Sequence, residues 1–135
     1  MRQSQKRPVS QLVAGLIVIL LLLLFARSIG DRSAPEETSA TRSIRMIHVA
    51  QTNYYSQFGR YAESLEELRA LLPDYDLASG VRYGYRFRVQ GSQTSYEVHA
   101  EPLRGGGSSY YSDQTLLLRR SPGPGSATST SEPLR

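Results

Sequence analysis

The sequence predicts an α+β protein with an N-terminal single transmembrane helix, followed by a long helix packed on a small antiparallel β-sheet. Three observations support this fold class. An uncharged apolar run extends from Val9 to Phe25, apolar residues recur at helical spacing up to residue 58, and two later segments alternate with period two. The chain has 135 residues, which is enough for one small domain beside the apolar run.

The apolar run at residues 9–26 is the predicted transmembrane helix. A spanning helix needs about 20 predominantly apolar residues, with a lower limit near 17, and this run is close to that limit. Three basic residues precede it, so the positive-inside rule places residues 1–8 in the cytoplasm as a basic leader and the rest outside. These basic residues are Arg2, Lys6 and Arg7.

A cleaved signal peptide is the alternative interpretation of the same run. Ala26, Arg27 and Ser28 form an imperfect small-x-small cleavage site after the apolar core. The apolar core is long for a signal peptide, which favours an uncleaved anchor followed by a juxtamembrane linker at residues 27–34. Both interpretations export the domain that follows.

The charge of the exported part is nearly balanced. The whole chain has a formal net charge of +4, but three of its 16 basic residues precede the apolar run and 12 acidic residues follow it. The high isoelectric point is therefore a poor argument for nucleic-acid binding. The chain has no cysteine, which excludes disulfides, cysteine metal sites and lipoprotein acylation.

A long helix is predicted from about Pro35 to the glycine at position 59. Proline suits a first helical turn, and glycine commonly ends a helix. Apolar residues recur at three- to four-residue steps, with Gln51 interrupting the stripe. The stripe consists of Ile44, Ile47, Tyr54 and Phe58.

A second, short helix is predicted in "SLEELRALLP". Ser64 and Glu67 have the spacing of a capping box, and Pro73 stops the helix. We expect the nearby aromatic residues to fill the end of the interface between helix and sheet. They are Tyr54, Tyr55, Phe58 and Tyr61.

The remainder is predicted to form about four antiparallel strands. "YRFRVQ" and "SYEVHAE" alternate, and a two-residue turn at Gly91-Ser92 would pair Phe87 with Tyr96. The same register pairs Tyr85 with Val98 and Arg86 with Glu97. A second hairpin is expected around residues 112–115, after the flexible "RGGGS" segment. Residues 121–135 lack periodicity and are expected to form a disordered tail.

Three stretches resemble bacterial type IV pilins and type II secretion pseudopilins. They are "SATRSIRMIHVAQTNYYSQFGRYAESLEEL", "LASGVRYGYRFRV" and "SYYSDQTLLLRR". The first matches the region just past the membrane helix in that family, and the last is similar to its closing hairpin. The resemblance implies a pilin-like α+β domain at residues 35–120. The matching residues of the first stretch are Ser39, Ala40, Ser43, Ile44, Arg45, Ile47, Ala50, Tyr54, Tyr55, Ser56, Phe58, Gly59 and Tyr61.

The chain departs from that family at the mouth of the apolar run. Prepilins have a glycine followed by Phe-Thr-Leu-Ile-Glu there, whereas Pro8, Val9 and Ser10 occupy that place here, and no acidic residue precedes Asp31. The glycine of the closing hairpin is replaced by Leu116. The resemblance therefore implies the domain more strongly than it implies processing or polymerisation.

We predict no catalytic residue, no cofactor site and no metal site. The two histidines, His48 and His99, lack cysteines or clustered acids beside them and are interpreted as structural or exposed. An acidic patch surrounds the short helix, and we interpret it as helix caps and solvated acids rather than as a calcium site, which it could also form. The patch consists of Glu63, Glu66, Glu67, Asp74 and Asp76.

Tyrosines and arginines of the strands suggest either a core or a binding face. Alternation places Tyr85 and Tyr96 inside, so the core is the better interpretation, and nucleic-acid binding is not expected. The full set is Tyr83, Tyr85, Tyr96, Tyr110 and Tyr111, with Arg82, Arg86 and Arg88.

The expected function is that of a structural subunit. The resemblance implies a protein of the bacterial inner membrane, with a cytoplasmic N-terminus and a periplasmic domain, in a type II secretion or type IV pilus-like assembly. Its partners would be the membrane and other assembly subunits, without a small-molecule substrate. A membrane-tethered adaptor or sensor that does not polymerise is the alternative, favoured by the missing glycine and glutamate.

Overall fold

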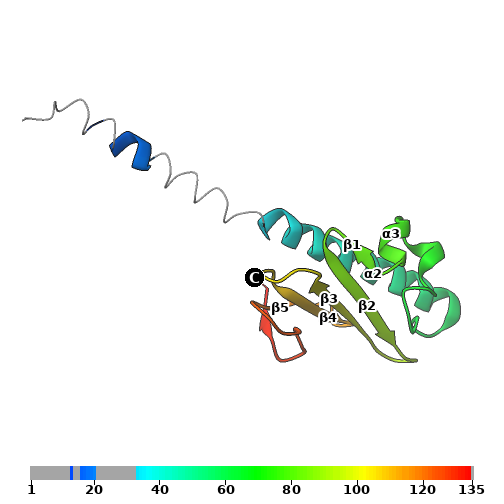
Figure 1. Cartoon of the computed structure of the whole chain (residues 1–135). Helices are drawn as coiled ribbons and strands as arrows, with labels where there is room; N and C mark the ends of the chain where they lie inside the picture. Colours follow the sequence, from blue (N-terminus) through cyan, green and yellow to red (C-terminus); the bar gives the residue numbers. More distant parts are fainter. Residues whose placement is uncertain (1–12, 14–15, 21–32, 135) are drawn as a thin grey trace, which may run out of the picture. The chain divides into compact units, whose positions relative to one another are not determined.

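The computed structural model describes Val13, residues 16–20 and residues 33–134 (Figure 1). The chain divides into two units, Met1–Arg32 and Ser33–Arg135. Within the described residues, no helix is long and apolar enough to cross a membrane. The predicted basic leader and most of the predicted transmembrane segment lie outside the residues that are described.

The sheet of the Ser33–Arg135 unit has six antiparallel strands in the order β1-β2-β3-β4-β5-β6. The predicted fold class is therefore wrong: a six-stranded meander stands in place of the small sheet of about four strands, and the described residues supply no spanning helix. The strands are β1 (Val81–Arg82), β2 (Tyr85–Gly91), β3 (Tyr96–Pro102), β4 (Ser109–Asp113), β5 (Arg119–Ser121) and β6 (Glu132–Pro133).

Helix α2 spans Ser33–Phe58 and supplies one side of the core. It ends at Gly59, whose φ of +69° is the left-handed conformation that glycine adopts without strain. Ile44 and Ile47 are fully buried, as the stripe predicts, but Phe58 is 60% exposed. The prediction that Tyr55 and Phe58 fill the interface is wrong, because both side chains are largely exposed at the end of the helix, Tyr55 by 44%.

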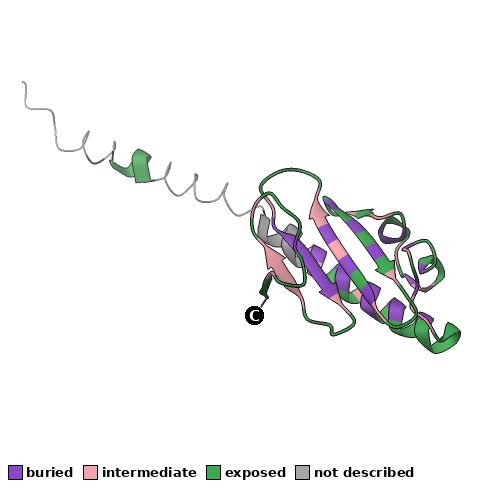
Figure 2. Ribbon diagram, turned by 90° about the horizontal axis from the view of Figure 1, so that it is seen from below, coloured by how far each residue is buried: buried purple, intermediate pink, exposed green. Residues whose placement is uncertain are grey.

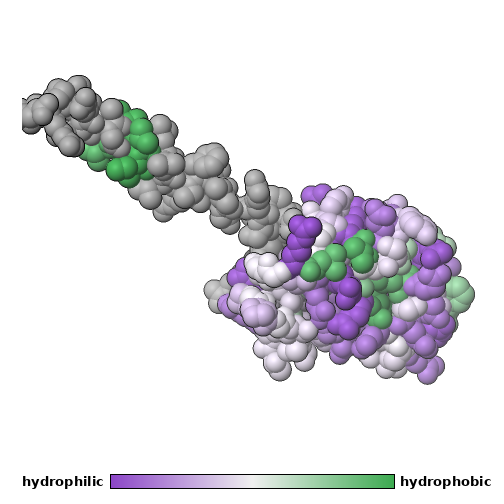
Figure 3. Space-filling view, viewed as in Figure 1, coloured by the Kyte–Doolittle hydropathy of each residue, from purple (hydrophilic) through white to green (hydrophobic). Residues whose placement is uncertain are grey.

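The sheet buries one face against this core. Along β2 and β3 buried residues alternate with more exposed ones, which Figure 2 shows as colour changes along the strands. The inward residues include Tyr85, Phe87, Val98 and Ala100, each at most 2% exposed. On the outer surface of the unit, hydrophobic side chains appear in separate patches among hydrophilic ones (Figure 3).

The β2–β3 hairpin forms in a register different from the predicted one. Phe87 pairs with Ala100, not with Tyr96, and Tyr85 pairs with Pro102. The turn is longer than two residues, because the Ser92 hydroxyl accepts from the Ser95 amide at 3.1 Å and stabilises a loop of residues 92–95. The pairing partner moves by four positions, an even number, so every side chain keeps its predicted face.

The predicted short helix over residues 64–73 is wrong. The segment forms successive turns and a 3₁₀ helix, η1 (Arg69–Leu71), followed by α3 (Tyr75–Ala78). The Glu67 carboxylate accepts from the amide of Glu63 at 2.9 Å, so it is not the reciprocal partner of Ser64 that a capping box requires. Asp74 caps α3 instead, because its side chain accepts from the Asp76 amide at 2.8 Å.

The segment from residue 121 to 134 packs against the rest of the unit. Residues 121–135 were expected to be a disordered tail, yet β6 pairs with β5, and Ala127 is 1% exposed. The Ser109 hydroxyl also donates to the Gly125 carbonyl at 2.6 Å. Composition could not indicate this packing, because the segment has no apolar periodicity. Both edges of the sheet end in two-residue strands, β1 and β6.

Candidate functional site

Two aromatic residues of the last turns of α2 and one just after it form the feature that we name the aromatic ledge: Tyr55, Phe58 and Tyr61. Phe58 is 60% exposed and Tyr55 is 44% exposed, whereas Tyr61 is half-buried. The Tyr55 and Tyr61 rings lie 4.7 Å apart, and Tyr61 packs at the same distance on the buried Tyr96. The ledge therefore exposes apolar rings that rest on the core of the domain.

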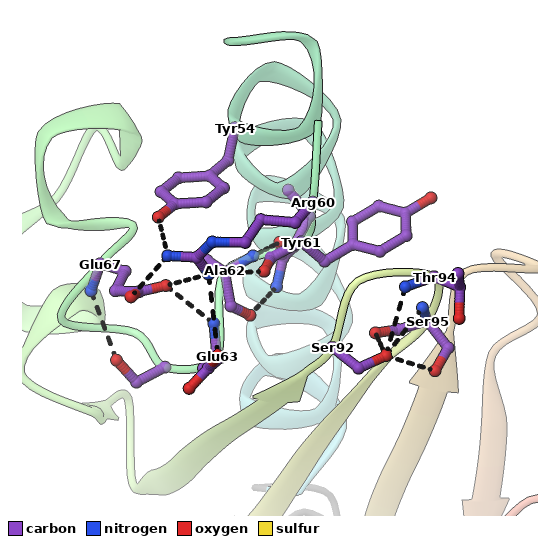
Figure 4. A network of polar contacts seen from close by, with 11 residues as sticks. Tyr54, Arg60, Tyr61, Ala62, Glu63, Glu67, Ser92, Thr94 and Ser95 are labelled. Atoms are coloured by element: carbon purple, nitrogen blue, oxygen red, sulfur yellow. Dashed lines mark hydrogen bonds and ion pairs between the residues drawn. The ribbon is translucent and has the colours of Figure 1, made fainter. Parts of the chain in front are cut away.

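Arg60 makes a network of polar contacts in the turn that carries Tyr61 (Figure 4). Its two terminal nitrogens donate to the two carboxylate oxygens of Glu67, each at 3.1 Å. The same guanidinium donates to the Tyr54 hydroxyl at 3.0 Å and to the Tyr61 carbonyl at 3.1 Å. Phe58 in turn packs on the Tyr54 ring at 4.4 Å. A bidentate arginine pair has a defined geometry, so it holds the turn in one conformation.

The ion pair with Arg60 changes the pKa of Glu67. The hydrogen bond from Arg60 is the main cause that lowers the pKa of Glu67 below its usual value, and the Glu63 amide adds to it. The carboxylate is therefore ionised near neutral pH, and the ion pair with Arg60, which we name the Arg60 clamp, is present there.

A buried glutamine attaches the following segment to the helix. Gln51 is 0% exposed, and its amide donates to the Ala62 carbonyl at 2.9 Å while its oxygen accepts from the Ala62 amide at 2.8 Å. The Tyr61 amide donates to the Ser92 carbonyl at 3.1 Å. Gln51, which interrupts the predicted apolar stripe, thus holds the segment next to Tyr61 and so helps to position the ledge.

His48 lies in the core between α2 and the sheet. Its Nε2 is 2.9 Å from the Ser112 hydroxyl, which donates to the Leu117 carbonyl, so Ser112 accepts from Nε2–H. Nδ1 then accepts from the Tyr96 hydroxyl at 2.6 Å. Burial lowers the pKa of His48, although the charge of Asp113 opposes the shift. The ring is neutral and both nitrogens are used, so the arrangement of serine and histidine is structural.

His99 lies on the opposite face of β3 from the His48 network. Its Nε2 is 3.3 Å from Glu97, and its ring meets Tyr111 edge-on at 5.2 Å. The structure does not bring the two histidines together. Among the described residues, no group of three or more histidine, aspartate or glutamate side chains could hold a metal ion.

The acidic patch is divided among separate partners. Glu66 pairs with Arg69 at 2.8 Å, and Asp74 pairs with Arg82 at 2.7 Å besides capping α3. Glu67 belongs to the Arg60 clamp described above, and Glu63 lies 3.9 Å from the same guanidinium. Glu63 and Asp76 are exposed. These acids do not converge on one point.

The strand tyrosines are mostly core residues. The prediction that Tyr85 and Tyr96 point inward is confirmed, since they are 2% and 3% exposed. Tyr110 is also inside, and Tyr111 is 4% exposed on the other face, where burial raises its pKa to about 12. Tyr83 is 58% exposed in the β1–β2 turn and stacks under Arg82. Arg86 and Arg88 are exposed, and Arg88 pairs with Glu101 at 2.8 Å.

Sequence reasoning missed both polar networks. Arg60 and Glu67 are seven residues apart with no common helix, so no helical or strand spacing joins them. His48, Tyr96 and Ser112 meet only because β3 and β4 pair and α2 packs against them. The one available signal was the polar Gln51 within an apolar stripe, which in a folded domain requires a buried partner.

Comparisons of the chain with protein-family models, with curated proteins and with solved structures find no match. The resemblance to pilins and pseudopilins thus depends on the three quoted stretches alone. One of its departures has a structural counterpart. Leu116 stands where the closing hairpin of that family has glycine, and its φ is +65°.

Proposed function

We propose that the chain is a membrane-anchored, non-enzymatic structural subunit of a type II secretion or type IV pilus-like assembly. In this proposal residues 9–26 form the anchor in the bacterial inner membrane, and the Ser33–Arg135 unit lies in the periplasm and binds other subunits. The apolar run and the three similar stretches support the anchor and the class of assembly. The aromatic ledge supports a role in protein–protein contact.

The ledge is the observation that carries this proposal. Aromatic residues and arginine are enriched among the residues that dominate binding energy at protein interfaces. Here Tyr55 and Phe58 are exposed, and Arg60 holds the residues on which they pack, Tyr54 under Phe58 and Tyr61 beside Tyr55. A surface that is rigid before binding loses little conformational entropy on association, which favours affinity.

A membrane-tethered adaptor or sensor is the second candidate function. The observation that favours it is Pro8-Val9-Ser10 in place of the prepilin cleavage motif, together with the absence of an acid before Asp31. An adaptor would keep its whole N-terminus and would bind a partner without entering a fibre. The ledge would serve as the partner surface in both cases.

The test is co-purification of the full chain from its native membranes after brief chemical crosslinking. We expect secretion or pilus-assembly proteins in the crosslinked material, and we expect Phe58→Ser to reduce their recovery while the neighbouring exposed Gln57→Ser does not. Recovery that is unchanged by Phe58→Ser would refute the role of the ledge. The intact mass of the purified chain separates the two candidates, because a start at Met1 favours the adaptor and a start near Val9 favours the fibre subunit.

A further inference from the structure

A hollow on the side of α2 is lined by exposed leucines, and we name it the leucine hollow. Its volume is about 270 Å³, and its lining includes Ile44, Arg45, His48, Leu116, Leu117 and Leu134. The three leucines are 61%, 41% and 38% exposed. A cavity of about 150 Å³ lined by aliphatic side chains accepts a benzene ring. The hollow is therefore large enough for one aromatic side chain.

Leu116, one of the leucines that line the hollow, has a strained backbone conformation. Its φ of +65° lies in the left-handed region, where a leucine is strained and glycine or asparagine is the usual choice. Its side chain gains little from burial in the isolated unit, because it is 61% exposed. A strained and exposed leucine indicates a function outside the isolated fold.

The aromatic ledge includes an exposed ring, that of Phe58, which is of a size that fits the hollow and lies elsewhere on the same helix. Phe58 lies 13 residues beyond Arg45, which is about 20 Å along α2 at 1.5 Å per residue. In its own chain Phe58 is held on Tyr54, far from the hollow. The ring of one copy can therefore enter the hollow only of another copy.

The charges around the two features are complementary. Residues 60–76, next to the ledge, contain five acidic side chains and two arginines. Three of the acids pair with Arg60, Arg69 and Arg82, so the excess negative charge is that of the other two, Glu63 and Asp76. Beside the hollow, Arg45 and Arg42 are exposed on successive turns of α2. Other charged side chains near the hollow include Asp113, whose charge acts on His48, and Arg120, which stands opposite Glu132 on the neighbouring strand.

We propose that the Ser33–Arg135 units associate head to tail, with Phe58 of one copy inserted into the leucine hollow of the next. The acidic segment beside the ledge then faces Arg42 and Arg45 of the second copy. Two different patches meet, so each copy retains one free ledge and one free hollow, and the contact repeats along a row. This inference rests on the proposed function, since a structural subunit needs such a contact, and it identifies a second copy as the partner.

Site-directed disulfide formation tests the contact, because the native chain has no cysteine. Full-length Phe58→Cys and Leu116→Cys chains are produced together in native membranes and oxidised. A disulfide requires Cα atoms within about 7 Å, so we expect crosslinked dimer at roughly ten times the yield given by Phe58→Cys with Leu103→Cys. Leu103 is the control, being 45% exposed on the β3–β4 loop. The double Phe58→Cys, Leu116→Cys chain should form a ladder of oligomers.

Three results would overturn the proposal. They are equal yields with the Leu103→Cys control, no crosslink for either pair, and efficient crosslinking of Phe58→Cys chains to each other, which would mean ledge against ledge. If a variant is not recovered folded, the adjacent exposed pair Gln57→Cys and Leu117→Cys replaces it.

Charge reversal supplies a second, independent measurement. Glu63→Arg or Arg45→Glu alone should reduce the crosslink yield several-fold, and combining the two should restore much of it. A yield that does not respond to either reversal would contradict the charge complementarity argued above. Loss of the self-contact with retained co-purification of assembly proteins would refute this inference and leave the proposed function standing.

Discussion

Replacement of Gln51 by leucine tests whether one buried side chain positions the aromatic ledge. The change keeps the approximate size of the side chain but removes both hydrogen bonds to Ala62, of 2.9 and 2.8 Å. The amide and carbonyl of Ala62 would then lack partners at a residue that is 0% exposed. Each buried unsatisfied group costs about 1–3 kcal/mol, so the sum is about 2–6 kcal/mol.

The apolar leucine recovers part of this loss. A buried aliphatic side chain contributes about 1.5–3 kcal/mol relative to an exposed one, but the aliphatic part of glutamine is already buried, so we set the gain at roughly 1 kcal/mol. We therefore expect the free energy of unfolding to fall by about 1–5 kcal/mol, with the centre of the range near 3 kcal/mol.

The assay is urea denaturation of the full chain in mild detergent, followed by far-ultraviolet circular dichroism and by tyrosine fluorescence. Gln57→Leu is the matched control, since Gln57 is exposed on the same helix and should change stability by less than about 0.5 kcal/mol. A loss for Gln51→Leu no greater than that of the control would refute the reasoning. Crosslinking through Phe58→Cys should fall in parallel, because the ledge would no longer be fixed.

Three further changes have defined outcomes. Gly91→Ala would place a Cβ 1.9 Å from the Ala62 carbonyl oxygen, so we expect a midpoint in urea well below that of Gly105→Ala, whose Cβ meets nothing within 4 Å. Leu116→Asn should raise the free energy of unfolding by about 1 kcal/mol, because asparagine tolerates the left-handed conformation. The pKa of His48 is lowered in the folded state, so the unfolded chain binds the proton first. Stability should therefore be complete above pH 6.5 and decrease as the pH falls below it, and thermal melting should show that this pH dependence is reduced in His48→Gln. A melting temperature with the same pH dependence in both chains would contradict the assignment.

Much of the strand pattern could be predicted from the sequence, because alternation depends only on neighbouring residues. Tyr85 and Tyr96 were placed on the buried face correctly, and the error of four in register left that face unchanged. The register itself depended on the Ser92 hydroxyl, which stabilises a longer turn than glycine alone suggested.

Features that need distant segments could not be predicted. Gln51 was an interruption in a helical pattern until Ala62 was placed beside it, and Phe58 was assigned to the core because the pattern does not show where the sheet ends. The C-terminal strand β6 depends on backbone pairing with β5, which composition does not encode. The candidate site was therefore visible in the sequence as a cluster of aromatic residues, but its exposure and its clamp were not.

The two-residue strands at the sheet edges limit the pairing of β1 or β6 with a strand of another chain. A long free edge recruits other chains through backbone hydrogen bonds, and the resulting ribbons are difficult to dissociate. Here β1 and β6 offer very short edges, β6 includes Pro133, and the far end of β2 is bordered by Tyr61 through the Ser92 carbonyl. The head-to-tail contact proposed above uses side chains instead, and the strength of such contacts responds to ionic strength and to single substitutions. If that contact forms, a row of copies held by it could be taken apart and rebuilt.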